Sequence, residues 1–324
     1  MPTDHNERGG DGFVHHACLY GSDEAFLAMA VPFIEAGLDE GGSVLAATTP
    51  ANIELLQDAL GERAKGLDTA ETAYFGRRPV DRVAAFQRYQ DSRTEPGRQI
   101  RMIAEPVWGG KSARQIAEWK RMESGLNVLL EDADLWMICP YDTRVVPPDV
   151  LEAARATHPA CVTGSSVLPS AAYIDPHVYA AAGDAPLPAV PAHADRLPPT
   201  GEPAAVRGFV RDRAAALGLA NERLALAELA VHEVVDYLVS ARGEEVAVRI
   251  WAESGLVVCD LHGPSVTRPS PDAFLGFRPP GEAAGLEDGL WLARSLCESV
   301  EVRAGRSRVR IRLRFAGPRN AERR

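Results

Sequence analysis

Short apolar runs alternate with amphipathic segments between residues 13 and 159, and this alternation constrains the fold of the chain more than any other feature. Runs such as SVLAATT (43–49) and DLWMICPYD (134–142) have the length of strands, and helical patterns follow them at 50–61 and 147–159. Strands that are apolar throughout are buried on both faces, and their alternation with helices is typical of a parallel sheet. The pattern predicts an α/β fold with three layers and a largely parallel sheet.

A proline-rich segment interrupts this pattern. Eight of the 24 prolines fall between residues 164 and 203, together with many alanines and few charges. Such a composition favours an extended, partly rigid connection. The sequence therefore predicts the following divisions: a flexible tail (1–12), a first domain (13–165), a linker (166–202), a second domain (203–317) and a basic tail (318–324).

Composition excludes several classes of function. The net charge of −10 argues against general binding to nucleic acid or to anionic membranes. No run approaches the ~18–20 apolar residues of a membrane span, and the first residues have no apolar core of a secretory signal. The five cysteines are scattered and form no CxxC pair. We therefore expect a cytoplasmic protein with reduced thiols.

The second domain has a distinctive order of elements. The pattern predicts two helices, two strands, a long loop, a helix and two strands, at 204–217, 221–241, 245–253, 255–263, 289–298, 299–305 and 306–315. With the stretch GLWLARSLCESVEVR, this order resembles the GHKL (Bergerat-type) ATPase fold, in the branch of anti-sigma factors and their serine kinases. The resemblance implies a two-layer α/β domain and a nucleotide site with three sequence stations.

The first station is a helix that carries a catalytic glutamate and, four residues later, a magnesium-binding asparagine. In LAVHEVVDYLVSARG the glutamate is Glu233, but Tyr237 replaces the asparagine. Positions i and i+4 share a helix face, so the phenol would point toward the magnesium position. A neutral phenol is a poor ligand for this hard cation.

The other two stations also depart from the family pattern. The adenine-binding aspartate falls on Gly263, unless a shift of the loop lets Asp260 serve. The glycine-rich turn keeps Gly289 but has Glu287 at the preceding glycine. Carboxylates there would repel phosphates from a helix N-terminus. The resemblance thus implies a degenerate ATP site without a cofactor, although Mg-ATP binding by an active serine kinase remains the alternative.

Arginines alternate with apolar residues along the last strand, RSRVRIRLRF (306–315). A period of two places all arginines on one face of the sheet. They form either the solvated face of a two-layer sheet or a basic patch for an acidic partner protein. In the second case the partner-binding residues are Arg308, Arg310 and Arg312.

The first domain resembles the MEDS family of sensory domains over roughly residues 13–176. The stretches that carry this resemblance are HHACLY, VPFIEAGLDEGGSVLAATTPAN, AEPVWGGKSARQIAEWKRMESGLN, CPYD and THP. The pattern also resembles a RecA/KaiC-like core. The segment LYGSDEAFLA, however, lacks the glycines, lysine and hydroxyl of a phosphate loop, so we expect no nucleotide hydrolysis here.

Polar residues collect where the strands of the first domain end, which is where parallel sheets bind ligands. The predicted small-molecule site consists of His16, Tyr20, Glu105, Trp108, Glu123, Asn127, Cys139, Tyr141 and Asp142. Each also has a structural interpretation, for example a buried histidine or a packed cysteine. A metal site from His16, Glu105, Cys139 and His158, or a hydrolase using Cys139 with His16 and Asp142, is conceivable, but the spacing demands neither, and we expect no metal.

Together these patterns predict a signalling regulator in which a sensory domain is coupled to an anti-sigma-type domain. That domain would bind a sigma factor or its antagonist without ATP turnover. One alternative is an active serine kinase that acts on the antagonist. Another is a small-molecule or metal sensor whose second domain forms a homodimer.

Overall fold

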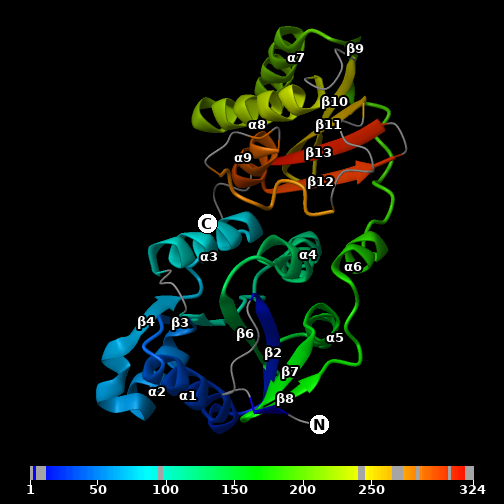
Figure 1. The fold of residues 1–324 in the computed structure, drawn as a ribbon. Helices are drawn as coiled ribbons and strands as arrows, with labels where there is room; N and C mark the ends of the chain where they lie inside the picture. The colour runs from blue at the N-terminus through cyan, green and yellow to red at the C-terminus, as the bar shows by residue number, and fades with distance from the viewer. Residues whose placement is uncertain are drawn as a thin grey trace. The chain divides into compact units, whose positions relative to one another are not determined.

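The computed structural model describes residues 3–4, 12–93, 98–239, 245–264, 273–281, 285, 287–305 and 308–317. They form two compact units, Met1–Gly183 and Asp184–Arg324 (Figure 1). Each unit has its own sheet and its own hydrophobic core.

The first unit is built on an eight-stranded sheet of order β1-β8-β7-β2-β6-β5-β3-β4. The strands are β1 (Thr3–Asp4), β2 (Val14–Tyr20), β3 (Val44–Thr48), β4 (Leu67–Glu71), β5 (Ile100–Ala104), β6 (Leu135–Asp142), β7 (Ala160–Thr163) and β8 (Ser166–Pro169). Strands β2 to β7 run parallel to one another, whereas β8 pairs antiparallel with β7 and β1 pairs antiparallel with β8 at one edge. The predicted, largely parallel sheet is therefore confirmed.

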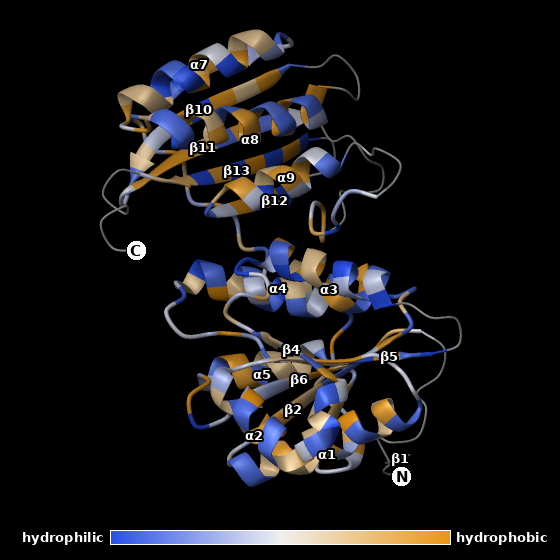
Figure 2. Ribbon diagram, turned by 90° about the vertical axis from the view of Figure 1, so that its left-hand side faces the viewer, coloured by the Kyte–Doolittle hydropathy of each residue, from blue (hydrophilic) through white to orange (hydrophobic). Residues whose placement is uncertain are grey.

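Helices cover both faces of this sheet. They are α1 (Asp23–Asp39), α2 (Pro50–Leu60), the 3-10 helix η1 (Gly61–Gly66), α3 (Pro79–Arg93), α4 (Ala113–Leu129), α5 (Pro148–Thr157) and α6 (Pro176–Ala182). Helices α1 and α2 lie on one face and α3 and α4 on the other (Figure 2), where α5 packs on α4. This is the arrangement expected when the crossovers between parallel strands are right-handed. Helix α4 begins with a capping box between Ser112 and Gln115, which fixes its start.

The second unit has a five-stranded antiparallel sheet of order β12-β13-β11-β10-β9. The strands are β9 (Asp195–Thr200), β10 (Val246–Glu253), β11 (Leu256–Pro264), β12 (Ser299–Ala304) and β13 (Arg308–Ala316). Helices α7 (Pro203–Ala216), α8 (Asn221–Val239) and α9 (Asp288–Leu296) pack on one face of it (Figure 2). The core lies between the helices and this face, so the predicted two-layer arrangement is present.

The proline-rich segment is not a single extended linker. Its first part forms β8 and α6 in the first unit, and its last part forms β9 at the edge of the second sheet. Prolines fit there because an edge strand leaves some backbone donors without a ladder partner. Within the predicted N-terminal tail, β1 pairs with β8. The rest of that tail up to residue 11, and the basic tail at 318–324, lie outside the described residues.

Two expectations about the whole chain can be compared with the structure. All five cysteines are free thiols, as predicted. Among the described residues, no helix has the length and apolar character needed to cross a membrane.

Candidate functional site

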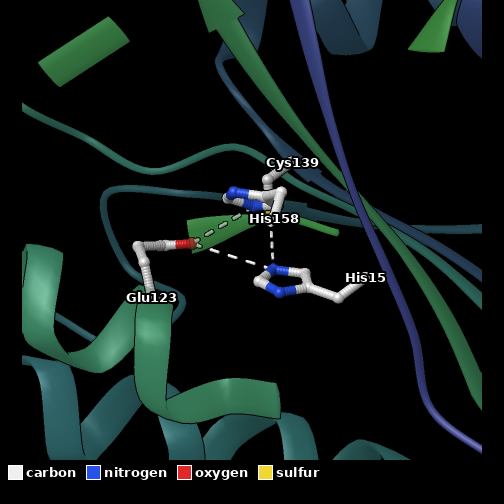
Figure 3. Close-up of side chains that lie close together, drawn as sticks. All are labelled: His15, Glu123, Cys139 and His158. Atoms are coloured by element: carbon white, nitrogen blue, oxygen red, sulfur yellow. Dashed lines mark hydrogen bonds and ion pairs between the residues drawn. The ribbon is translucent and has the colours of Figure 1, made fainter. Parts of the chain in front are cut away.

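Four buried side chains meet on the α4 face of the first sheet (Figure 3). His15 comes from β2, Cys139 from β6, Glu123 from α4, and His158 follows the end of α5. One nitrogen, sulfur or carboxylate oxygen from each of these residues lies within 4.8 Å of those of the other three. We call these four residues the His–Glu–Cys–His cluster.

The strand register explains why His15 and Cys139 share a face. Ala17 is the parallel partner of Cys139, and residues two apart on a strand point to the same side, so His15 faces the same helix layer. The Sγ of Cys139 lies 3.4 Å from Nε2 of His15. The two histidine rings contact each other, with their centroids 4.0 Å apart.

The outer nitrogens of both imidazoles are held by hydrogen bonds. Asn127 donates its amide to the carbonyl of Thr157 at 2.9 Å and turns its Oδ1 toward Nδ1 of His15, 3.2 Å away. Nδ1 of His158 lies 2.8 Å from the carbonyl of Ala154. Because both partners are acceptors, both Nδ1 atoms carry the proton. Each Nε2 therefore presents a lone pair to the interior of the cluster.

Burial sets the protonation of the cluster. It lowers the pKa of His15 well below its usual value and lowers the pKa of His158 to about 3. Burial raises the pKa of Glu123 to about 7, partly offset by Arg82, and raises that of Cys139 well above the usual range. The imidazoles are thus neutral and the thiol is protonated, which does not favour a nucleophilic cysteine.

Several predicted site residues surround the cluster. Tyr141 donates from its hydroxyl to Oε2 of Glu123 at 3.5 Å, and its ring stacks on Trp108 with centroids 6.3 Å apart. Asn127 orients His15, as described above. The structure therefore brings together five of the residues predicted for a ligand site: Trp108, Glu123, Asn127, Cys139 and Tyr141.

The structure places the other predicted residues elsewhere. His16 faces the α1 side, where Nε1 of Trp136 donates to it at 3.4 Å. Asp142 pairs with Arg144, with Nη2 and Oδ2 2.8 Å apart. Neither side chain reaches Cys139, so the hydrolase triad is not assembled. The conceivable metal set is corrected in the same way, because His15 replaces His16 and Glu123 replaces Glu105.

Tyr20 and Glu105 belong to a second polar network at the carboxyl ends of β2, β3 and β5. The Glu105 carboxylate accepts hydrogen bonds from the hydroxyls of Tyr20 and Thr48 and, at 3.0 Å, from the amide of Asn52. Asn52 also donates to the Tyr20 hydroxyl at 3.1 Å. The side chains satisfy one another, which indicates a brace between α2 and the sheet.

The comparison with known families bears on this unit. Residues 14–159 match the family described as MEDS, the MEthanogen/methylotroph, DcmR Sensory domain. The match supports a sensory role in signalling for the first unit. All four residues of the cluster lie within the MEDS-matched segment. No protein of curated function matches the chain.

A pocket of about 400 Å³ lies in the second unit, beside α8 and the start of α9. Its lining consists of Pro203, Glu233, Asp236, Tyr237, Val239, Gly285 and Gly289. Three of these residues, Glu233, Tyr237 and Gly289, come from stations of the resemblance. The Tyr237 side chain is buried in the wall, and burial together with nearby Glu287 raises its pKa to about 12.

The turn before α9 carries two adjacent acidic residues, Glu287 and Asp288. Glu287 is exposed at the position before the helix, and Asp288 accepts a hydrogen bond from the backbone N–H of Gly285 at 2.7 Å. A side-chain carboxylate therefore already satisfies this backbone donor. Gly289 lies so close to α8 that an added Cβ would sit 2.6 Å from Oε2 of Glu233.

The Asp260 side chain points to the face of the sheet that carries no helix, whereas the pocket lies on the helix side. Its carboxylate accepts from Nε of Arg310 at 2.8 Å and from Nε of Arg312 at 2.7 Å. Gly263 points to the helix layer, where an added Cβ would contact Leu238 at 3.3 Å. Asp260 therefore does not face the pocket, as the predicted alternative adenine-binding position would require.

The arginine face of β13 is only partly solvated. Arg312 and Arg314 are each 1% exposed, so solvent does not reach this part of the face. Arg312 donates to the carbonyl of Pro188 at 3.1 Å and packs against Trp251, while Arg314 pairs with Glu301. Residues of the proline-rich segment thus cover the middle of the strand. Of the three residues predicted to bind a partner, Arg308 is exposed, Arg310 is half-buried and Arg312 is buried; Arg306 lies outside the described residues.

Proposed function

We propose that this protein is a signalling regulator in which the MEDS-matched segment senses a signal and the second unit binds a regulatory protein. That protein would be a sigma factor or an antagonist of an anti-sigma factor. The observation that carries the proposal is the pocket beside α8, which retains Glu233 and Gly289 but contains Tyr237 in its wall. It keeps the frame of a nucleotide site without its metal ligand.

The chemistry of this pocket argues against Mg-ATP. A phenol with a raised pKa is neutral near pH 7 and offers little to Mg²⁺. The carboxylates of Glu287 and Asp288 stand where phosphates would approach a helix N-terminus. Glycine at position 263 provides no side chain for an adenine amino group. All three departures weaken the binding of a nucleotide and leave the surface of the pocket available to another ligand.

The charges of the pocket favour a basic group on the partner. Glu233 and Asp236 line it, and Asp236 is exposed on α8. Opposite charges across an interface speed association and suppress wrong partners. A lysine or arginine of the partner would therefore fit here better than a triphosphate. The identity of the partner class rests on the resemblance to the anti-sigma branch.

Calorimetry with Mg-ATP tests the first half of the proposal. We expect no measurable heat of binding and no phosphate transfer to any antagonist protein. Micromolar binding of Mg-ATP together with phosphate transfer would contradict the proposal and support the serine kinase.

The second half is tested by measuring affinity for each sigma factor and antagonist of the source organism. We expect one of them to bind, and Asp236→Lys to weaken that binding about tenfold or more through charge reversal. Asp212→Lys is the matched control, because Asp212 is an exposed aspartate of α7 that does not line the pocket. Equal losses in the two variants, or no binding at all, would overturn the assignment.

A further inference from the structure

We propose that the His–Glu–Cys–His cluster binds a zinc ion through His15, Glu123, Cys139 and His158. The MEDS match assigns a sensory role to this segment but no metal. This inference is independent of partner binding by the second unit, so either can fail without the other.

The ligand types suit zinc. Imidazole nitrogen, thiolate sulfur and carboxylate oxygen are its common ligands in proteins, and four of them complete a tetrahedral shell. A thiolate and a carboxylate together carry two negative charges, which the dication cancels. The four side chains are 0–4% exposed, and a buried site of this kind is least costly when its charges balance.

The spacing of the atoms also fits. Bonds of about 2.0–2.3 Å in a tetrahedral site place neighbouring ligand atoms about 3.3–3.8 Å apart. Nε2 of His15 lies 3.4 Å from Sγ of Cys139 and 3.9 Å from Oε2 of Glu123. Nε2 of His158 lies 3.8 Å from the same carboxylate oxygen. Only small side-chain movements are needed to place all four atoms around one ion.

The histidines are oriented as metal ligands are. Each Nδ1 is tied to an oxygen, of Asn127 for His15 and of the Ala154 carbonyl for His158, which directs each Nε2 inward. This outer hydrogen bond fixes the tautomer and ring direction of metal-bound histidines.

A buried nitrogen without a hydrogen-bond partner indicates independently that a ligand binds in the cluster. His158 is 0% exposed, and its Nε2 has no hydrogen-bond partner among the residues that the structure describes. Its distance of 3.8 Å to Glu123 is too long for a hydrogen bond. A buried polar atom without a partner is costly, and a metal ion at the centre of the cluster would satisfy it.

Metal analysis of the purified full-length protein is the first test. We expect one zinc per chain, retained through dialysis. After removal of zinc by a chelator, titration with Co²⁺ should give a thiolate-to-cobalt charge-transfer band and the visible bands of a tetrahedral ion, saturating at one equivalent. Absence of stoichiometric zinc together with absence of the thiolate band would overturn the proposal without any variant.

Variants locate the site. Cys139→Ser should abolish the thiolate band, and His158→Gln should weaken zinc binding about 100-fold or more. Cys18→Ser and His16→Gln are matched controls, because Cys18 and His16 lie on β2 and face the opposite side of the same sheet. A thiolate band that persists in Cys139→Ser, or is lost equally in Cys18→Ser, would contradict the assignment.

Asn127→Leu tests the orientation of His15. Loss of the outer hydrogen bond should weaken zinc binding about 10–100-fold while the thiolate band remains. Unchanged zinc affinity in this variant would show that Asn127 does not position a metal ligand.

Discussion

At the residue scale, burial decides the chemistry of the thiols. It raises the pKa of Cys18 to about 12, so only about one molecule in ten thousand carries this thiolate at pH 8. We expect Cys18 to resist iodoacetamide in the folded protein and to gain reactivity about tenfold per pH unit toward that pKa. Half-buried Cys161 is the internal reference and should label faster. Peptide mass spectrometry measures both rates, and equal labelling at pH 8 would contradict this prediction.

Gly289 controls how closely α9 approaches α8. The carboxylate of Glu233 can turn away from an added Cβ, but the Cβ and the carbonyl oxygen of Glu233, at 3.2 and 3.4 Å, are held in α8. Gly289→Ala should therefore destabilise the protein by about 1–2 kcal/mol in urea unfolding. Gly208→Ala is the control in α7, where an added Cβ meets no described atom within 4 Å. It should stabilise by about 0.5–1 kcal/mol, because alanine favours a helix. Opposite signs are the decisive result, and equal changes would refute the close approach.

Single residues also show the limit of inference from sequence. The sequence led to Cys139 and Tyr141 because they lie toward the carboxyl end of a parallel strand. It led to Glu123 and Asn127 because positions i and i+4 share a helix face. It selected His16 in place of His15, since two adjacent histidines point to opposite faces and only the register with β6 decides between them.

At the scale of elements, the period of two along β13 correctly predicted which residues enter the core. It did not predict that part of the opposite face is buried. Val309, Ile311 and Leu313 are all buried against the helices. The arginines face the opposite side, where the Pro188 carbonyl accepts a hydrogen bond from buried Arg312, whereas Arg308 at the start of the strand is exposed. A composition rich in proline indicates extended chain but does not say what the chain packs against. Strand β4 was not predicted, because Leu67 is its single buried residue and the strand therefore has little apolar pattern.

Asp260 holds this covered face together. Its carboxylate is buried and pairs with Arg310 and with Arg312, whose side chain is 1% exposed. Asp260→Asn would leave a buried guanidinium without its counter-charge, and we expect a loss of about 3 kcal/mol in the free energy of unfolding. Asp212→Asn breaks an exposed pair with Arg211 and should cost less than about 1 kcal/mol. Similar losses in both variants would mean that the Asp260 pairs are not structurally important.

At the scale of the whole molecule, two cores predict two unfolding events. The first unit has a parallel sheet with helices on both faces, and the second has an antiparallel sheet with its own helix layer. Apolar burial is the main source of stability, and each core is complete within its unit. The division near residue 183 followed only approximately from sequence, because prolines mark the region of a boundary rather than its position.

Calorimetry of the full chain should therefore show two transitions that respond to different changes. Removal of zinc, or His158→Gln, should lower only the transition of the first unit by several degrees, since a metal bound in the folded state stabilises the unit that holds it. Asp260→Asn should lower only the other transition, by about 10 °C for a loss of about 3 kcal/mol. His16→Gln and Asp212→Asn are the respective controls. One cooperative transition that both Asp260→Asn and zinc removal lower would show instead that the two units unfold together.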